Sequence, residues 1–484
     1  MISRPHYQSA STLVSQLRQG KIKSEQLLEI YLDRVEKFNP TLNAIIWQDI
    51  DSARAAARAA DRSLARGEKP GPLHGLPMTL KEANDIAGVL TTNGDPALRN
   101  NVAAQDAVIT RKLRDAGAII FGKTNIPFRM ADWQTFNEIY GTTHNPWDLS
   151  KTPGGSSGGA AVALATGMTS AEVGSDIGSS IRNPAHFNGI FGLKPSWGII
   201  SLRGHGAPGN YVPADIGVNG PLARSARDLD LLLDVLISPD PLDAPAWQVV
   251  LPRCKKKSVK EFKIALKLND KYAPIDDQYA ACLQNFADSL AAAGATVVEA
   301  EPDVDTSRVH EIYLRFLRAA MSAGMNEADI QEWRDKRDSP DGQRNPHYMQ
   351  AVVEGFDMRH RDWLVLDNER RKLREKYATF FEDYDILLCP AAMSAAWPQN
   401  QTGERWQRQI PINDGLAFDV DQLFWSGYSG VVLLPSTVGP CGFVGQLPVG
   451  YQAIAGFGQD KTATAFSRAV ERELVKFRPP PGYE

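Results

Sequence analysis

The sequence predicts an α/β fold, because stretches typical of helices and of strands alternate along it. Residues 107–121 comprise a helical stretch, a glycine suited to its C-cap and a short apolar run typical of a buried strand. Residues 262–300 repeat strand, helix and strand in that order. These two regions, far apart in the chain, indicate α/β architecture in both halves of the protein.

Two helices are expected before the first of these regions. After Ser24, apolar residues recur at helical spacing and stop at Asn39-Pro40, which predicts an amphipathic helix that packs one face. An Ala/Arg-rich helix follows from about residue 51 to 65. In the rest of the chain we expect helices over 160–165, 226–237 and 461–477, a mostly helical portion over 309–383, a surface connection over 238–258, and strands over 384–390, 430–434 and 449–455.

Composition and charge indicate a soluble globular enzyme. Hydrophobic residues make up 43% and charged residues 23% of the 484 residues, which fits neither a disordered chain nor a fibre. The net charge of −4 gives no electrostatic reason to expect a nucleic acid or an anionic membrane as a partner. The start of the chain lacks the apolar core of a signal peptide, and no apolar run approaches the ~18 residues that span a bilayer, so we expect a cytoplasmic protein.

The cysteines and the basic residues suggest no special site. The four cysteines, at positions 254, 282, 389 and 441, are far apart and form no C-x-x-C pair, which indicates reduced thiols rather than a disulfide or zinc framework. We expect neither a metal nor a cofactor. The one basic cluster, over residues 253–257, is interpreted as a solvated loop.

Two turns rich in glycine and serine stand out. The first, residues 152–159, would be interpreted as a flexible linker if it stood alone, but it leads into the apolar helix-forming run 160–165. It also lacks the Gly-Lys-Ser/Thr ending of a phosphate-binding loop. In the second turn, residues 174–185, small residues before Ser180 would expose consecutive N–H groups, as an oxyanion hole requires.

A nucleophilic serine needs a base, and two candidates are open. His186 follows Ser180 by six residues with a proline between them, so it would reach back to the Ser180 hydroxyl only awkwardly, and a structural role is favoured. Lys81 ends a strand-like stretch after a Pro/Gly turn, which would deliver its amine to a sheet edge. A lysine among apolar residues could be unprotonated and accept the proton.

Three blocks of the sequence together resemble the amidase signature family. They are residues 73–81 (LHGLPMTLK), 154–159 (GGSSGG) and 176–185 (DIGSSIRNPA), the last followed by Gly189, Gly192, Lys194 and Pro195. The resemblance extends from the helix after Ser24 to residues 447–452, nearly the whole chain. It implies one domain over residues 1–484 with a large mixed central β-sheet covered by helices on both faces. Within it we expect a core with the catalytic motifs over about 65–240, a more variable and largely helical substrate-side portion over 240–400, and a return to the core over 400–484.

The resemblance also implies a Ser-cisSer-Lys triad. Ser180 would be the nucleophile, Lys81 the base, and Ser156, preceded by a cis peptide bond, the serine that bridges them. A free lysine has a pKa of about 10.4, so burial would have to lower the pKa of Lys81 before it could accept a proton near neutral pH.

The surroundings of the triad are assigned by the same resemblance. The oxyanion hole would be formed by the N–H groups of Ile177, Gly178, Ser179 and Ser180. Ser179 stands where the family usually has glycine, so its Cβ could narrow the acyl pocket, and its hydroxyl is an alternative nucleophile. Supporting roles would fall to Ser157, which would hold its loop, and to an ion pair of Asp176 with Arg182. Candidates for the substrate pocket are Met130, which the resemblance implies, and Trp133, Phe136, Trp425 and Tyr428, which are proposed from their aromatic side chains rather than from the resemblance.

The resemblance therefore implies an amidase that hydrolyses a carboxylic amide C–N bond through an acyl-enzyme intermediate. Side activity on esters or carbamates is expected, because they present the same carbonyl, so aryl acylamidase and urethanase activities are both candidates. The alternative is the glutaminase subunit of an aminoacyl-tRNA amidotransferase, and a non-catalytic scaffold is a third, less favoured interpretation. The expected partner is a small-molecule amide, with no nucleic acid and no membrane, and the protein could form a homodimer.

Overall fold

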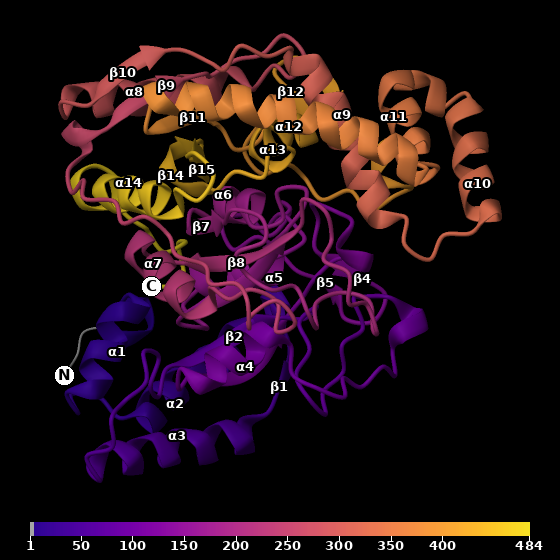
Figure 1. Cartoon of the computed structure of the whole chain (residues 1–484). Coiled ribbons are helices and arrows are strands. Elements are labelled where there is room, and N and C mark those ends of the chain that lie inside the picture. The colour runs from indigo at the N-terminus through magenta and orange to yellow at the C-terminus, as the bar shows by residue number, and fades with distance from the viewer. Residues whose placement is uncertain (1–3) are drawn as a thin grey trace.

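The computed structural model describes residues 4–484 and is organised around a mixed sheet of eight strands (Figure 1). The strand order is β10-β9-β11-β15-β14-β7-β8-β6. Strands β10, β9 and β11 run parallel to one another, and all other neighbours are antiparallel. The bounds are β6 (Glu172–Asp176), β7 (Phe191–Lys194), β8 (Val218–Ala223), β9 (Lys263–Leu266), β10 (Thr296–Glu299), β11 (Ile386–Pro390), β14 (Ser436–Val444) and β15 (Leu447–Ile454).

A second, three-stranded sheet lies beside the edge strand β6. Its order is β1 (Ile45–Gln48), β3 (Ile119–Thr124) and β2 (Pro77–Lys81), so β2 is an edge strand, as expected for the stretch that ends at Lys81. All five residues of β2 are buried. Two small hairpins complete the strands: β4 (Phe136–Asn137) with β5 (Gly141–Thr142), and β12 (Gln409–Ile412) with β13 (Gly415–Phe418).

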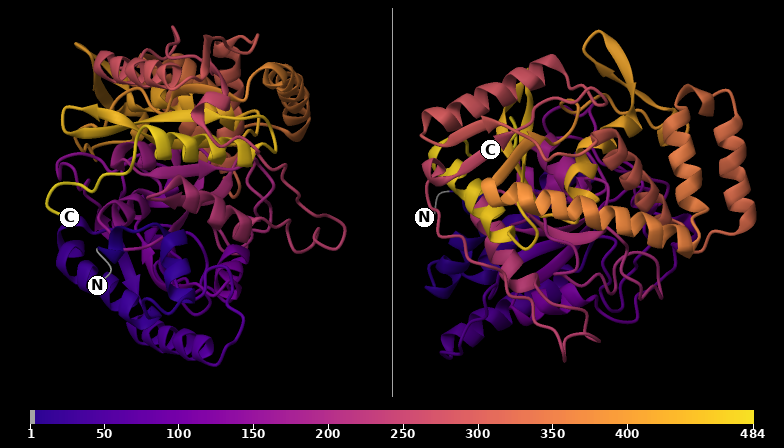
Figure 2. Two further views of the ribbon diagram at one scale, coloured as in Figure 1. Left: turned by 90° about the vertical axis from the view of Figure 1, so that its left-hand side faces the viewer. Right: turned by 45° about the horizontal axis from the view of Figure 1, so that its top comes forward.

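Helices surround these sheets, and α10 and α11 stand out to one side of them (Figures 1 and 2). The helices of the first half are α1 (Ala10–Arg18), α2 (Ser24–Leu42), α3 (Ile50–Ala65), α4 (Val108–Asp115), α5 (Gly158–Ala165), α6 (Arg182–Asn188) and α7 (Ala226–Leu236). Those of the second half are α8 (Asp277–Ala292), α9 (Thr306–Met321), α10 (Glu327–Asp338), α11 (Pro346–Phe356), α12 (His360–Asp383), α13 (Leu423–Gly430) and α14 (Asp460–Glu473).

Strand β7 shows how both faces of the large sheet are covered. A Cβ added to Gly192 would lie 2.8 Å from the Ile181 side chain and 3.2 Å from that of Ala185, so glycine lets α6 approach this face closely. Leu193, the next residue of the strand, points to the opposite face of the sheet, and it shares a core cluster with Leu229 of α7. The expected mixed sheet with helices on both faces is therefore confirmed.

Three sequence-based assignments were wrong: the last helix, expected over 461–477, is α14 and already ends at Glu473, and two others differ as follows. Helix α2 does not stop at Asn39-Pro40 but runs on to Leu42, and Asn43, with a left-handed φ of 49°, ends it. Residues 430–434, an apolar run that predicts a strand, instead close α13 and turn, because Leu433 has a φ of +66°. The strand there begins only at Ser436.

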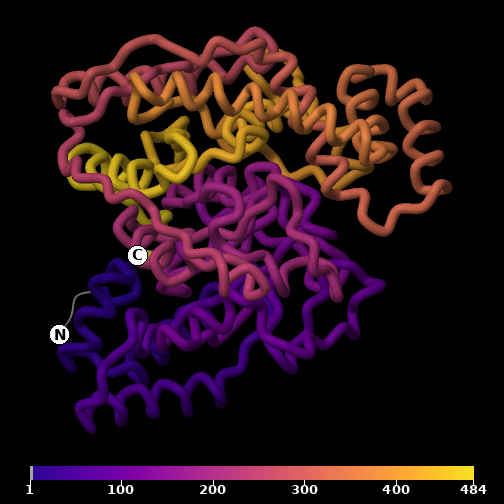
Figure 3. The backbone as a smooth tube through the Cα atoms, viewed as in Figure 1, coloured from indigo at the N-terminus to yellow at the C-terminus, as the bar shows by residue number. Residues whose placement is uncertain are grey.

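The C-terminal segment lies beside the N-terminal helices (Figure 3). Figure 3 traces the backbone from the N-terminal helices to the C-terminal segment, which returns beside them. The Tyr7 hydroxyl donates a hydrogen bond of 2.6 Å to the carbonyl oxygen of Tyr483. Among residues 4–484, no helix is both long enough and apolar enough to cross a bilayer.

Candidate active site

The two sheets meet at their edge strands, and Lys81 lies at this junction. It is the last residue of β2 and its side chain is fully buried. Its Nζ lies 2.7 Å from Ser156 Oγ, 3.0 Å from Ser157 Oγ and 2.8 Å from Ser175 Oγ. Ser156 and Ser157 come from the first glycine turn, whereas Ser175 lies on β6, so three separate parts of the fold converge on one amine.

Burial controls the charge of Lys81. Desolvation lowers the pKa of Lys81 to about 7, although the negative charges of Asp176, Glu172 and Glu82 oppose the shift. Within residues 4–484, no carboxylate forms an ion pair with Lys81 at 4.0 Å or less. Glu172 compensates little, because burial raises its own pKa to about 8 and leaves its carboxyl mostly uncharged at pH 7. A large fraction of Lys81 is therefore neutral at neutral pH.

Close packing shapes the first turn. The peptide bond between Gly155 and Ser156 is cis. A Cβ on Gly155 would lie 2.3 Å from the carbonyl oxygen of Asp132, and one on Gly158 would lie 2.2 Å from Thr135 Oγ1, so these positions accept only glycine without a shift of their neighbours.

Asn183 joins the first turn to the second. Its Oδ1 accepts from the Gly155 N–H at 3.0 Å, and its Nδ2 donates to the carbonyl oxygens of Gly155 at 2.5 Å and Ser179 at 2.8 Å. The Ser157 N–H donates to the Ser180 carbonyl oxygen at 3.1 Å, a second link between the turns. Ser157 thus bonds both to Lys81 and to the second turn.

Asp176 and Arg182 form a fully buried ion pair in which Arg182 Nη2 lies 2.9 Å from Asp176 Oδ1. Burial by itself would raise the pKa of Asp176, but the charge and hydrogen bonds of Arg182 outweigh it, so the pKa lies below its usual value. Arg182 Nη1 also donates to the Ser426 carbonyl oxygen, Ser429 Oγ and Gln452 Oε1, at 3.0, 2.9 and 2.7 Å. The pair fastens the second turn to α13 and β15.

The N–H groups of the second turn do not all face the same way. The Ser179 N–H donates to Asp176 Oδ1 at 3.0 Å, so it is already satisfied inside the protein rather than free for an oxyanion. Within residues 4–484, the N–H groups of Ile177, Gly178 and Ser180 make no hydrogen bond. Ser179 is buried with a φ of 72°, its hydroxyl has no hydrogen-bond partner, and it does not line the cavity described next.

A cavity of about 180 Å³ opens at the junction of the turns. Ser156, Ser175 and Ser180 line it together with Ile177 and Gly178. Of the aromatic and sulfur-containing pocket candidates, Met130 and Trp133 also line the cavity, and Trp133 Nε1 donates to the Gly178 carbonyl oxygen at 2.7 Å.

The structure places three pocket candidates elsewhere: Phe136, Trp425 and Tyr428 do not line this cavity. Trp425 and Tyr428 belong to α13, whose residues are all buried. Trp425 Nε1 donates to the Ala273 carbonyl oxygen, and the Tyr428 hydroxyl lies 3.3 Å from Glu301 Oε2. Phe136 packs under the guanidinium of Arg408, 5.5 Å from its ring centroid.

His186 has a structural role. Its Nδ1 accepts from the Gly450 N–H at 2.7 Å, and its Nε2 lies 2.9 Å from the Ser394 carbonyl oxygen, so both ring nitrogens are occupied. Burial lowers its pKa to about 4. The histidine is therefore not placed to serve Ser180 as a base.

Sequence reasoning gave no role to several residues of this site. Ser175 lies at the start of the second turn. The only feature of the sequence that could have pointed to a role for it was its position next to Asp176 on the strand β6. Arg318 and Arg405 also line the cavity, but they come from α9 and from a short helical turn, η6 (Arg405–Gln407), so only the tertiary fold brings them there.

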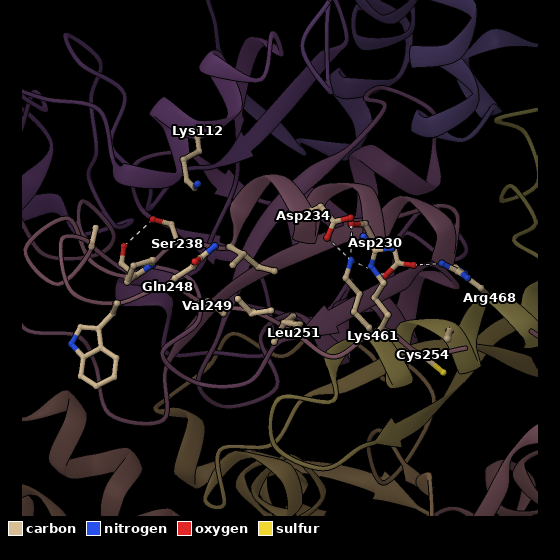
Figure 4. A pocket seen from close by; sticks show the side chains of 17 residues that line it. Lys112, Asp230, Asp234, Ser238, Gln248, Val249, Leu251, Cys254, Lys461 and Arg468 are labelled. Carbon is tan, nitrogen blue, oxygen red and sulfur yellow. Dashed lines mark hydrogen bonds and ion pairs between the residues drawn. The ribbon is translucent and has the colours of Figure 1, made fainter. Parts of the chain in front are cut away.

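A larger hollow of about 1070 Å³ lies away from the triad, beneath the connection over residues 238–258 (Figure 4). Figure 4 shows Lys461 between Asp230 and Asp234, at 3.3 and 2.6 Å, and Arg468 beside Asp230. These charges compensate one another, and among the described residues that line the hollow no serine is hydrogen-bonded to a lysine, unlike the arrangement around Lys81.

Comparisons with known proteins place the whole chain in one family. The sequence model of the family described as Amidase matches residues 26–463. An indoleacetamide hydrolase of Bradyrhizobium diazoefficiens is 33% identical, over 96% of this chain and 86% of its own. An acylamidase of Rhodococcus erythropolis is 31% identical over 97% and 96% of the two chains, and a glutamyl-tRNA(Gln) amidotransferase subunit of an Azoarcus species is 31% identical over 96% and 99%. A solved structure described as a crystal structure of amidase superposes with a TM-score of 0.77 at 27% identity, covering 97% of this chain and all of the other.

Proposed function

The chain belongs to the amidase family, and from this premise we propose that it hydrolyses the C–N bond of a small carboxylic amide, with Ser180 as nucleophile, Ser156 as bridge and Lys81 as base. The observation that carries the proposal is the buried Lys81 amine, 2.7 Å from Ser156 Oγ and with a pKa of about 7, beside a cavity that Ser156 and Ser180 both line.

In the acylation step, Ser180 Oγ attacks the amide carbonyl carbon and forms the C–O bond. Its proton passes to Ser156, whose own proton passes to Lys81 Nζ. The carbonyl oxygen gains the negative charge and accepts hydrogen bonds from the free N–H groups of Ile177, Gly178 and Ser180, and each such donor contributes ~3–4 kcal/mol to lowering the barrier. Ser179 is left out of this oxyanion hole because its N–H is taken by Asp176.

The leaving nitrogen must be protonated before the C–N bond breaks, because an amide anion is too basic to depart. Lys81 returns the proton through Ser156, and the amine or ammonia leaves. A water molecule then attacks the acyl-enzyme while the same two groups accept its proton. Lys81 returns this proton through Ser156 to Ser180 Oγ as the ester bond breaks, and the acid product loses its own proton to solvent and leaves as the carboxylate. Esters and carbamates present the same carbonyl, so we include side activity on them in the proposal.

A second candidate is the glutaminase subunit of an aminoacyl-tRNA amidotransferase. The observation that favours it is the 31% identity to the amidotransferase subunit of the Azoarcus species over nearly the full length of both chains. Turnover of glutamine alone, together with co-purification of a partner subunit, would select this candidate. Turnover of simple amides by the isolated chain would select the free-standing amidase.

The test is hydrolysis of a mixed panel of aliphatic amides, aryl amides, aryl carbamates and glutamine, followed by mass spectrometry. We expect Ser180→Ala to lower turnover of any cleaved substrate by at least about 10⁴-fold while the fold remains. Ser289→Ala, on the exposed side of α8, is the matched control and should retain full activity. Full activity in both Ser180→Ala and Lys81→Met would reject the proposed triad.

A further inference from the structure

The wall of the catalytic cavity carries one positive charge that no carboxylate compensates. Its acidic residues and arginines are Asp132, Asp176, Arg129, Arg318 and Arg405. Four of them form ion pairs with residues outside the lining: Asp132 with Arg408, Asp176 with Arg182, Arg129 with Asp95, and Arg405 with Asp419. Arg318 differs, since in the part of the chain from residue 4 to 484 no carboxylate oxygen lies within 4.0 Å of its guanidinium.

The hydrogen bonds of Arg318 are also incomplete. Its Nη2 donates to the Tyr348 hydroxyl, and its Nη1 lies 3.7 Å from the sulfur of Met321, a weak acceptor. Its Nε is buried and has no hydrogen-bond partner. A guanidinium has five N–H donors and cannot lose its charge near neutral pH, so an arginine at a cavity wall without a carboxylate partner favours an anionic acceptor.

Arg405 adds a second guanidinium with spare donors. Its Nε donates to Asp419 Oδ1 at 2.9 Å, its Cζ lies 5.3 Å from the centroid of the Trp133 ring, and its side chain is 15% exposed. Its Nη2 is buried without a hydrogen-bond partner. Trp133 fixes this arginine relative to the reaction centre, because the same indole donates to the Gly178 carbonyl oxygen in the second turn.

The two arginines line the same cavity. Arg318 donates to the Tyr348 hydroxyl, and Arg405 lies against Trp133. Two like charges repel each other in a site with little water, and Asp419 offsets only one of them. We propose that Arg318 and Arg405 form a subsite for a carboxylate group of the substrate, so that the preferred amide is itself an anion.

A carboxylate fits this subsite. Its two coplanar oxygens match the fork of N–H groups that a guanidinium presents. The cavity measures about 180 Å³ and also holds the hydroxyl of Ser180, so the carboxylate and the scissile carbonyl must belong to one small molecule. The inference rests on the proposed function, because it names the substrate class of the same cavity.

The experiment compares matched pairs of amides that differ in one carboxylate. Glutaramate and pentanamide place it on the acyl side, whereas 4-acetamidobenzoate and acetanilide place it on the amine side. For at least one pair we expect wild type to prefer the anionic member in kcat/KM, mainly through a lower KM. Hydrogen bonds to charged groups are strong enough that Arg318→Gln should reduce this preference by roughly ten- to a hundred-fold, with the neutral member little affected.

Arg315→Gln is the matched control, because Arg315 lies one turn earlier on α9, pairs with Glu354 and does not line the cavity. This variant should keep the preference of wild type. Arg405→Lys keeps a positive charge beside Asp419 and tests the second guanidinium without leaving that buried carboxylate unpaired; we expect a smaller loss of preference. No preference in wild type, or a preference that survives Arg318→Gln, would overturn the inference.

A binding measurement separates failure of the subsite from failure of the proposed function. Calorimetric titration of glutarate into Ser180→Ala requires no turnover. Binding that weakens roughly ten-fold or more in Ser180→Ala/Arg318→Gln supports the subsite even if no amide is hydrolysed, in which case the proposed reaction alone is wrong. Benzoate is titrated in the same way as glutarate. If neither binds while neutral amides are cleaved normally, the subsite is rejected and the amidase proposal stands.

Discussion

Lys81 Nζ and Ser156 Oγ are 2.7 Å apart, and the two side chains are 0% and 1% exposed. This contact joins the end of β2 to a turn that lies far along the chain, and it holds an amine away from water and from any paired carboxylate. Because desolvation lowers the pKa of Lys81 to about 7, the contact places a base rather than a permanent cation beside the serines.

The first prediction concerns the pH dependence of catalysis. Only neutral Lys81 can accept a proton, so kcat/KM for a neutral amide should rise about ten-fold per pH unit at acidic pH and level off above about pH 7. A rate profile between about pH 5 and pH 9 measures it. An activity that stays flat through neutrality, or that rises only near the pKa of a free lysine at about 10.4, would contradict the role given to this amine.

The second prediction concerns stability. The pKa of Lys81 is about 7 in the folded protein and about 10.4 when unfolded, so between these values the unfolded chain binds one more proton. The free energy of unfolding therefore rises with pH across this window, and this gain is lost as the pH falls toward 7. Relative to Lys81→Met, the free energy of unfolding of wild type should increase by about 1.4 kcal/mol per pH unit.

Urea unfolding of both proteins at several pH values from about 7 to 9 provides the measurement. The comparison with Lys81→Met removes contributions from all other titrating groups, since these are common to both proteins. Parallel stability curves for wild type and variant over this window would mean that the lysine is protonated in the folded state.

The third prediction concerns Arg182. Arg182→Leu leaves Asp176 buried without its counter-charge, and breaking one side of a buried pair costs about 3–5 kcal/mol of unfolding free energy. Denaturant unfolding should show this loss, together with a fall in activity, because Asp176 also accepts the Ser179 and Ile181 N–H groups of the second turn.

The control is Arg66→Leu, which removes an exposed pair with Glu68 and should change the free energy of unfolding little. If the two variants are equally stable, the buried pair does not hold the second turn in place.

Local patterns predicted most elements of the fold, and their failures have physical causes. The stretch ending at Lys81 forms an edge strand as expected, because its apolar residues and the preceding turn agree with its place between two sheets. Residues 430–434 failed because a run of valine and leucine is equally suited to a buried helix end and to a buried strand. Only the left-handed turn at Leu433 decides between them.

In the site, too, features fixed by local sequence were predicted, and features that depend on tertiary packing were not. The motif residues Lys81, Ser156 and Ser180 come together because short, glycine-rich turns fix their positions locally. The aromatic residues of α13 were placed in the pocket only because they were aromatic, and a helix buried on all sides gives such side chains no route to the cavity. Arg318 and Arg405 carried no local signal, since their common place at the cavity wall depends on how α9 packs against distant segments.

The last prediction concerns Ser179, which combines two unfavourable features. Its φ of 72° lies in the left-handed region, which costs a non-glycine residue about 1–2 kcal/mol, and its buried hydroxyl has no hydrogen-bond partner. Ser179→Gly removes both and gains flexibility in the unfolded chain, which costs about 0.5–1 kcal/mol. The balance favours the variant, so we expect its free energy of unfolding to be higher by about 1 kcal/mol.

Activity should persist in Ser179→Gly, because the N–H that Asp176 binds remains and the removed hydroxymethyl group does not line the cavity. Denaturant unfolding and kcat/KM for one amide, each measured beside Ser157→Gly, test this. Ser157 is bonded to Lys81 Nζ at 3.0 Å, so that comparison variant should lose both stability and activity. A Ser179→Gly protein that is less stable than wild type would show that this side chain supports the turn, and a loss of activity comparable to that of Ser180→Ala would make Ser179 the nucleophile.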